Sequence, residues 1–328
     1  MSPRLLLAAP LAAVLAVSVP LAASARPSGE PVPLAVVTTS VETPVLYDDE
    51  EGGNASGDDP AIWVDPGDSR DSIVIATAKE GGLRVYDLDG AELQSLTAEP
   101  APRADGVDGR YNNVDIAYGI DLGSGPADIA VVSDRYNDQL RFFAIDAAGA
   151  EASVPLHEVT APELPFLFSA DRDEVDEEQT AYGLAVWQPK GQAPVAVVTR
   201  EGHTTVATAA LTVADGRVGY TPVASVDFPA SFALPDGTTW TPCDEPGVLP
   251  QLEGLSVDQR TGVLYAAQED VGLWRLQLPI GSGEPKLIDR VRDFGIHDAY
   301  DPESEECAPV DAEATRFGGT ALEGRAGG

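Results

Sequence analysis

The sequence predicts an all-β fold, and two observations about its patterning support this prediction. Apolar residues almost never recur at the spacing of an amphipathic helix. Short runs rich in Val, Ile and aromatic residues follow one another instead, separated by clusters of Gly, Asp, Asn and Pro. A chain of 328 residues, of which 43% are hydrophobic, is long enough to bury one large core.

The first group of strands begins with the hexapeptide DDPAIW, whose apolar part reads as a buried strand. Three further strands follow it, and the sequence DLDG predicts a hairpin turn between the last two. The four predicted strands are Ala61–Val64, Ile73–Ala76, Leu83–Tyr86 and Glu92–Leu96.

This strand pattern then returns three times, as VDIAYGI with ADIAVVSD and QLRFFAID, as YGLAVW with PVAVVTREG and TVATAALT, and as EGLSVD with GVLYAAQED and GLWRLQL. The four units begin near Asp59, Asp115, Tyr182 and Glu253, at intervals of 56, 67 and 71 residues. A propeller blade usually takes roughly 40–50 residues, so we assign the excess to loops. Four-stranded units around an axis form a β-propeller. A β-sandwich is the alternative, but it does not explain why polar residues return at one place in each unit.

Residues 1–25 have the pattern of a secretory signal peptide. Arg4 precedes a nearly continuous apolar stretch, and Ala23-Ser24-Ala25 is a small-residue cleavage signal. A membrane anchor is the alternative, but Pro10 and Pro20 interrupt the stretch. We therefore expect a secreted protein with a signal peptide at 1–25, an N-terminal extension at 26–44 and a propeller domain at 45–328.

The net charge restricts the partners of the protein. The chain has 20 basic and 54 acidic residues, and loss of residues 1–25 removes one arginine, which leaves a net charge of −35. Such a surface repels nucleic acids and anionic membranes, so neither is an expected partner. We expect a monomer. Most of the acidic residues serve solubility, and a minority remains as candidate metal ligands.

The two cysteines, Cys243 and Cys307, lie in acidic, proline-containing stretches. In a secreted chain a disulfide between them is the default expectation. A catalytic cysteine is the weaker alternative, since neither residue is followed by the arginine of a phosphate-binding cysteine loop.

Polar residues at the start of each unit are the candidate functional residues. Adjacent carboxylates at the mouth of a strand need either a solvated turn or a cation, and their oxygens suit calcium. In a propeller the unit starts converge on one channel, and so do the residues that follow the second strand of each unit. The first set is Asp58, Asp59, Asn113, Asp115, Tyr182 and Glu253, and the second is Lys79, Arg135, Arg200, Glu201, Glu269 and Asp270.

Seven segments in order make the chain resemble the β-propeller phytases, which are secreted, calcium-dependent phosphatases of bacteria. They are DDPAIW, TAKEGGLRVYDLDG, NNVDIAYG, SDR, AYGL, VTREG, and QLEGLSVD with AAQED, and they span about residues 45–290. The resemblance implies a six-bladed propeller that hydrolyses phytate, presented as calcium-phytate, with several Ca²⁺ ions as cofactors and water as the attacking group.

The resemblance also implies roles for individual residues. Glu253, Asp59 and Asp115 are the expected catalytic residues. The expected calcium ligands are Asp58, Asp59, Asn113, Asp115, Glu253, Glu269 and Glu323. The expected phosphate-binding residues are Lys79, Arg135, Tyr182 and Arg200, with Glu201 beside them.

The chain departs from the family pattern at two places. Glu80 stands where the family has a second basic residue next to Lys79. The family also continues beyond the fourth unit with a D-x-E-G-L segment and more than one further blade. Here the chain ends GGTALEGRAGG, with Ala321 at the aspartate position and Glu323 at the glutamate position. We therefore expect the last one to two blades to be incomplete.

Each candidate residue also has an ordinary structural interpretation. Asp58 and Asp59 suit a turn, Arg135 and Arg200 suit solvated loops, and Tyr182 suits a core position with a bonded hydroxyl. Their return at one position of successive units favours a site. An inactive or non-enzymatic calcium-binding propeller is the second functional hypothesis. A calcium-dependent lactonase is a third, against which the basic residues argue.

Overall fold

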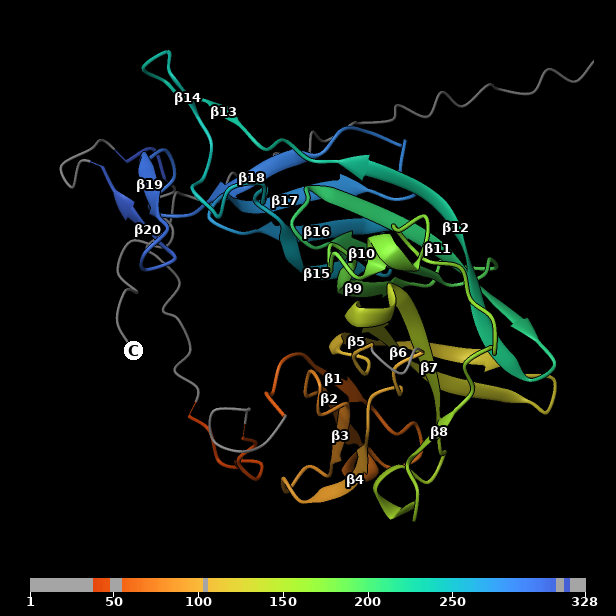
Figure 1. Cartoon of the computed structure of the whole chain (residues 1–328). Helices are drawn as coiled ribbons and strands as arrows, with labels where there is room; N and C mark the ends of the chain where they lie inside the picture. Colours follow the sequence, from red (N-terminus) through yellow and green to blue (C-terminus); the bar gives the residue numbers. More distant parts are fainter. Residues whose placement is uncertain (1–37, 48–54, 103–105, 311–315, 319–328) are drawn as a thin grey trace, which may run out of the picture. The chain divides into compact units, whose positions relative to one another are not determined.

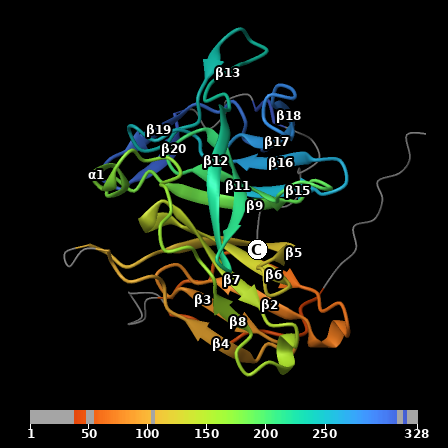
Figure 2. The same ribbon diagram turned by 90° about the vertical axis from the view of Figure 1, so that its right-hand side faces the viewer.

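Four antiparallel sheets of four strands form the main body of the structure, a computed structural model that describes residues 38–47, 55–102, 106–310 and 316–318. The chain divides into two compact units, Met1–Ser40 and Val41–Gly328, and all that follows lies in the second. The expected signal peptide lies outside the described residues. The all-β prediction is confirmed, and Figures 1 and 2 show the four sheets as successive groups of strands.

Each sheet is built from four strands that are consecutive in the chain, so we call the sheets blades 1 to 4. Blade 1 is β1 (Pro60–Trp63), β2 (Ile73–Thr77), β3 (Leu83–Tyr86) and β4 (Glu92–Leu96). Blade 2 is β5 (Tyr111–Asp121), β6 (Pro126–Asp134), β7 (Gln139–Ile145) and β8 (Leu156–Glu158). Blade 3 is β9 (Ala181–Trp187), β10 (Val195–Arg200), β11 (Thr205–Ala214) and β12 (Arg217–Asp227). Blade 4 is β15 (Leu252–Asp258), β16 (Val263–Gln268), β17 (Gly272–Gln277) and β18 (Lys286–Arg290).

Smaller elements lie within the blades, between them and after blade 4. Two-stranded sheets are formed by β13 (Phe232–Ala233) with β14 (Thr239–Trp240), and by β19 (Asp298–Asp301) with β20 (Glu306–Pro309). The short helices are η1 (Ser69–Asp71), η2 (Arg135–Asn137), η3 (Gly149–Glu151) and α1 (Arg172–Val175). Helix α1 begins where the carboxylate of Asp171 accepts the amide hydrogen of Glu174. The segments between the strands therefore contain little regular structure.

The strands form where the sequence pattern places them because one face of each sheet is buried. In β2 the exposure alternates along the strand, with Ile73, Ile75 and Thr77 fully buried. The predicted DLDG turn is confirmed, since Oδ1 of Asp87 accepts the amide hydrogens of Asp89 and Ala91 at 2.9 and 2.8 Å.

Three apolar cores lie between successive blades. Large side chains at their centres are Trp63 and Tyr111 between blades 1 and 2, Phe142 between blades 2 and 3, and Leu264 between blades 3 and 4. The innermost strands β1, β5, β9 and β15 contact one another in that order. This packing of face on face, with the first strand of each sheet innermost, is the arrangement of propeller blades.

Buried hydroxyl groups link neighbouring blades at the end of the second strand. The hydroxyl of Thr77 donates a hydrogen bond to the carbonyl oxygen of Asn112 at 2.7 Å, and that of Ser133 donates to the carbonyl oxygen of Tyr182 at 2.7 Å. Thr199 occupies the matching position of blade 3 and accepts the amide hydrogen of Gly183. All three hydroxyl residues are buried. The Thr77 and Ser133 contacts fix the inner strands of neighbouring blades relative to one another, whereas the Thr199 contact lies within blade 3.

The predicted disulfide between Cys243 and Cys307 is present, and it ties the segment after β14 to strand β20. Within the described part of the chain, no helix is long and apolar enough to cross a membrane.

Candidate functional site

Asp58 and Asp59 take their positions from the ladder between β1 and β2. The amide of Asp58 donates to the carbonyl oxygen of Thr77, and the amide of Thr77 donates to the carbonyl oxygen of Asp59, each at 3.0 Å. Because side chains alternate along an extended chain, the two adjacent carboxylates point to different places. Oδ2 of Asp58 lies 4.0 Å from Nζ of Lys79, while Oδ2 of Asp59 accepts the amide hydrogen of Val114 at 3.0 Å.

Lys79 lies in a tight turn between β2 and β3. The amide of Gly82 donates to its carbonyl oxygen, and its own φ angle of 51° lies in the left-handed region. A residue other than glycine rarely adopts this conformation, and it costs roughly 1–2 kcal/mol. The turn holds the ammonium group next to Asp58, so the strained backbone belongs to a candidate site residue.

The cationic residues of blades 1 and 2 are joined through their backbones. The amide of Tyr111 donates to the carbonyl oxygen of Lys79 at 3.1 Å, and the amide of Arg135 donates to the carbonyl oxygen of Arg110 at 2.8 Å. The side chains of Arg110 and Arg135 are each 17% exposed. Arg110 is a member of this group that the sequence prediction missed.

Ion pairs then connect Arg135 to blade 3. Its Nη2 contacts a carboxylate oxygen of Glu201 and lies 3.9 Å from Oε2 of Glu178. Its guanidinium carbon lies 5.9 Å from the ring centroid of Tyr182. Burial raises the pKa of Glu201 to about 7. The charge of Glu178 raises this pKa further, while the charge of Arg135 lowers it. This carboxyl group therefore changes charge near neutral pH.

Tyr182 lies among carboxylates. Burial is the largest cause that raises the pKa of its phenol, and the charges of Glu253, Glu269 and Glu201 raise it further. Its hydroxyl group therefore stays protonated and can donate a hydrogen bond. A tyrosine in this setting suits the binding of an anion better than proton transfer at neutral pH.

Glu253 reaches across the inner strands to blade 2. Its Oε1 accepts a hydrogen bond from Nδ2 of Asn112 at 3.0 Å, and the same nitrogen lies 2.8 Å from Oδ1 of Asn113. The backbone makes this approach possible, since a Cβ atom on Gly183 would lie 2.0 Å from the carbonyl oxygen of Glu253. Glu269 is held by Gln251 at 3.2 Å, and burial, followed by the charge of Glu253, raises its pKa.

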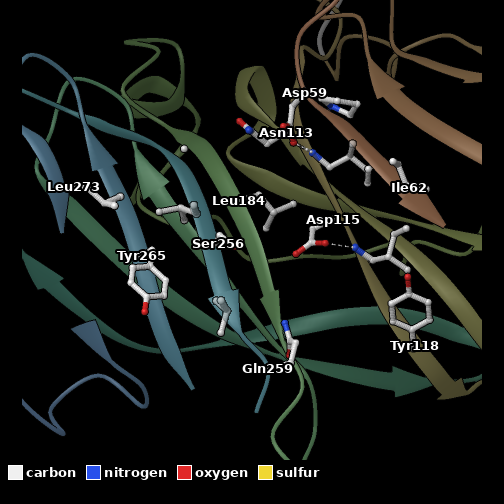
Figure 3. Close-up of a pocket in the computed structure, with 17 residues that line it drawn as sticks. Asp59, Ile62, Asn113, Asp115, Tyr118, Leu184, Ser256, Gln259, Tyr265 and Leu273 are labelled. Carbon is white, nitrogen blue, oxygen red and sulfur yellow. Dashed lines mark hydrogen bonds between the residues drawn. The ribbon is translucent and has the colours of Figure 1, made fainter. Parts of the chain in front are cut away.

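A cleft of about 610 Å³ lies beside these residues, between β1, β5 and β15. Figure 3 shows Asp59, Asn113 and Asp115 on one side of it and Ser256, Tyr265 and Leu273 on the other. The carboxylate of Asp115 accepts the amide hydrogens of Ile116 and Val186, each at 2.7 Å. Burial raises the pKa of Asp115, and it raises that of Asp59 to about 6.

The structure thus divides the predicted residues into two adjoining groups. The mouth group, defined here as Tyr182 and the charged residues that interact around it, contains Asp58, Lys79, Arg110, Arg135, Tyr182, Glu201, Glu253 and Glu269. The cleft group contains Asp59, Asn113 and Asp115. Arg200 joins neither group, because its guanidinium donates to the carbonyl oxygen of Gln179 at 2.8 Å, lies 3.4 Å from Glu174 and stacks near Phe168. Glu323 lies outside the described residues.

The predicted residues offer oxygen donors of the type that calcium prefers. Burial and the charge of Glu253 raise the pKa of Asp58, and Asp58 and Asp115 contribute to the raised pKa of Asp59, so a cation would relieve repulsion here. In residues 38–47, 55–102, 106–310 and 316–318, no group of three His, Cys, Asp or Glu side chains is placed to hold a metal ion. The oxygen atoms of the predicted ligands are of the type that a hard cation such as calcium binds.

Comparison with known proteins places the chain in a family. The model of the family described as Phytase matches residues 4–204. The 3-phytase of Bacillus subtilis (strain 168) is 30% identical over 259 residues, which cover 77% of this chain and 56% of that protein. The chain therefore spans about half the length of this curated relative.

Among solved structures, a protein from Lactobacillus plantarum is similar with a TM-score of 0.42 and 15% identity, over 74% of this chain and 68% of that one. The family match covers more than half of the present sequence and includes the first three unit starts. The chain belongs to the phytase family.

Proposed function

We propose that this chain is a secreted, calcium-dependent phosphomonoesterase that removes phosphate groups from phytate. The observation that carries the proposal is the mouth group, in which Lys79 and Arg135 face Asp58 and Glu201 within a site of a phytase-family chain. Cations beside crowded carboxylates suit a substrate that is itself densely negative and arrives with divalent cations.

The proposed division of labour follows from the contacts. Lys79 and Arg135 donate charge-assisted hydrogen bonds to phosphoryl oxygens, and the protonated hydroxyl of Tyr182 adds a neutral donor. Arg200 is a more distant candidate, since it must leave Glu174 to reach a phosphate. Glu201 holds Arg135 in place until the substrate competes for it.

Asp58, Asp59, Asn113, Asp115, Glu253 and Glu269 are the proposed calcium ligands among the described residues. Calcium, when bound, supplies positive charge that neutralises these carboxylates and lowers the pKa of water in the site. We propose Glu253, Asp59 and Asp115 as the catalytic residues. Asp115 already accepts two amide hydrogens, so the remaining lone pairs of its carboxylate would act in catalysis.

The test is release of phosphate from phytate by the purified chain, with calcium titrated from a chelated state to excess. We expect release only with calcium. Glu253→Gln should lower both calcium affinity and turnover, whereas Glu284→Gln, an exposed residue of the loop before β18, should change neither. Arg135→Ala should raise the KM for phytate. A folded sample that releases no phosphate at any calcium concentration would rule out the enzymatic function.

A non-enzymatic calcium-binding propeller is the second candidate. The observation that favours it is that Asp59 and Asp115 already accept backbone amide hydrogens of the neighbouring blade, which is a structural role that needs no reaction. Calorimetric binding of calcium to a chain that releases no phosphate would support this candidate. Absence of calcium binding would contradict both.

A further inference from the structure

A segment that the disulfide anchors lies beside the mouth group. We call this segment, residues 243–251, the strap; it begins at the disulfide-bonded Cys243 and leads into β15. Near its other end, the buried carbonyl oxygen of Pro250 accepts a hydrogen bond from Nε2 of Gln268 at 2.7 Å. The strap is therefore attached at both ends.

The strap also contacts the turn that follows β10, through Gly202. The amide of Leu249 donates to the carbonyl oxygen of Gly202 at 3.0 Å, and the amide of Gly202 donates to Oε1 of Gln251 at 2.7 Å. Both backbone groups of Gly202 are thus bonded to the strap. Gly202 follows Glu201, the residue of the mouth group that contacts Arg135. The strap therefore connects blade 4 to the turn of blade 3 that carries Glu201.

The bond from Gly202 determines which way the side-chain amide of Gln251 faces. Because Oε1 is turned toward Gly202, Nε2 is left to donate, and it lies 3.2 Å from each carboxylate oxygen of Glu269. The backbone adds a further bond, since the carbonyl oxygen of Gln251 accepts the amide hydrogen of Glu269 at 3.0 Å. Gln251 thus holds Glu269 through both its main chain and its side chain.

A neutral donor suits a carboxylate that is to bind a cation. A lysine or arginine at position 251 would pair with Glu269 and compete with calcium for its charge. The amide of Gln251 leaves that charge intact, and the lone pairs that Nε2 does not use remain available to a metal ion. Glu253 and Glu269 repel each other here, so a fixed support is needed to keep both carboxylates in the site before calcium binds.

We propose that Gln251 is a positioning residue that holds the carboxylate of Glu269 ready to bind calcium and links it to the turn that carries Glu201. The inference rests on the proposed function, since it takes Glu269 to be a calcium ligand. Preorganisation reduces the entropy that is lost on binding, because the carboxylate is already ordered. Removal of the amide should therefore weaken calcium binding although the charge of the site is unchanged.

The experiment measures the calcium affinity of the chelator-treated chain by titration calorimetry. Glu269→Gln identifies the calcium-binding step to which Glu269 contributes. Gln251→Met keeps nearly the same side-chain size but donates no hydrogen bond, and it should raise the Kd of that step about tenfold. The double variant should match Glu269→Gln alone, because without the carboxylate the amide has nothing to position.

Gln277→Met is the matched control in the same blade. Nε2 of Gln277 donates to the carbonyl oxygens of Thr261 and Gly262 at 2.9 and 3.1 Å, and both acceptors lie outside the mouth group. Each Met variant leaves backbone groups unpaired, so both should lower the midpoint of urea unfolding in a chelating buffer. Only Gln251→Met should change the calcium Kd, which separates positioning from a general loss of stability.

An unchanged calcium Kd for Gln251→Met, or an equal rise for Gln277→Met, would overturn the inference. A rise that persists in the Glu269→Gln background would also overturn it, because the amide would then act elsewhere. If Gln251→Met does not fold, Gln251→Asn decides. Its amide is one methylene group shorter and should raise the Kd several-fold, so an unchanged Kd would again overturn the inference.

Failure of the proposed function gives a different result. A wild-type chain that binds no calcium would contradict that function before any variant is compared. A wild-type chain that binds calcium with an affinity that Glu269→Gln does not change would instead remove Glu269 from the ligands, and the inference would fall with it. The two failures are therefore distinguishable.

Discussion

Oδ2 of Asp115 accepts a hydrogen bond from the amide nitrogen of Val186 at 2.7 Å, and this contact joins the inner strands of blades 2 and 3. Asp59 makes the corresponding contact from blade 1 to blade 2, through the amide of Val114. Two residues that the sequence identifies as candidate metal ligands thus also connect neighbouring blades. Their carboxylates belong to the scaffold as well as to the candidate site.

This relationship predicts that Asp115→Asn destabilises the protein even without calcium. An asparagine offers one acceptor oxygen where two amides now donate, so one buried amide loses its partner. The expected loss in the free energy of unfolding is about 1–3 kcal/mol. Urea denaturation in a chelating buffer measures it, with Asp89→Asn in the exposed hairpin turn as the control. An unchanged unfolding midpoint for Asp115→Asn would contradict the scaffold role.

The buried hydroxyl of Ser133 leads to a second prediction. It accepts the amide hydrogen of Asn113 at 2.9 Å and donates to the carbonyl oxygen of Tyr182. Ser133→Ala leaves both groups buried and unpaired, so we expect a loss of about 1–3 kcal/mol in the free energy of unfolding. Thermal and urea unfolding should agree on this loss. Ser225→Ala, on the exposed part of β12, should fall within about 0.5 kcal/mol of wild type.

Substitution of Lys79 should affect the stability of the protein and its binding of phytate in different ways. Its φ angle of 51° is strained for lysine but natural for glycine, so Lys79→Gly should keep the stability or raise it by up to about 1 kcal/mol. The same variant should raise the KM for phytate, because it removes the proposed contact between Lys79 and a phosphate group. Glu305→Gly, at a φ of 57° in an exposed hairpin, is the matched control. It should give the same backbone gain with an unchanged KM, and a destabilised Lys79→Gly would contradict the strain argument.

The raised pKa of Glu201 predicts that the stability of the protein depends on pH. Its folded pKa is raised from 4.5 to about 7, mainly by burial, so the folded state binds its proton more tightly than the unfolded state. This contribution is fully present below about pH 4.5 and is lost as the pH rises through 7. At one pKa unit per 1.36 kcal/mol, the loss is about 3 kcal/mol at most.

Glu201→Gln should remove this dependence. The variant should match wild type at pH 4 and exceed it in thermal stability at pH 8. Melting curves at pH 4, 6 and 8 measure the difference, and Glu284→Gln should follow wild type throughout. Parallel wild-type and Glu201→Gln curves across this range would show that the carboxyl group does not titrate there.

Strand positions could be read from the sequence because they depend on local pattern. Ile73–Ala76, Leu83–Tyr86 and Glu92–Leu96 were expected from alternation and β-branched residues, and β2, β3 and β4 lie there. The hairpin at Asp87 followed from turn chemistry alone. The disulfide between Cys243 and Cys307 followed from the presence of just two cysteines in a chain that is expected to be secreted.

The residues of the site could be predicted less completely than the strands, because membership of the site depends on where side chains point. Arg200 and Glu201 are adjacent, yet Glu201 contacts Arg135 while Arg200 turns toward Glu174 and Phe168. Adjacent residues at a strand end diverge, and a shift of one residue changes which of them enters a site. Arg110 precedes the NNVD segment and carries no pattern of its own, so the sequence offered no signal for it.

The sequence by itself determined the all-β class, the four repeating units, the disulfide and the resemblance to the phytases. Each follows from local pattern, residue count or segment order, which need no knowledge of contacts between units. The tertiary structure decided that Asp115 joins blades, that Arg110 stands between Lys79 and Arg135, and that Glu80 pairs with it. These are contacts between residues of different blades. Packing and backbone hydrogen bonding set them, and no periodicity along the chain encodes them.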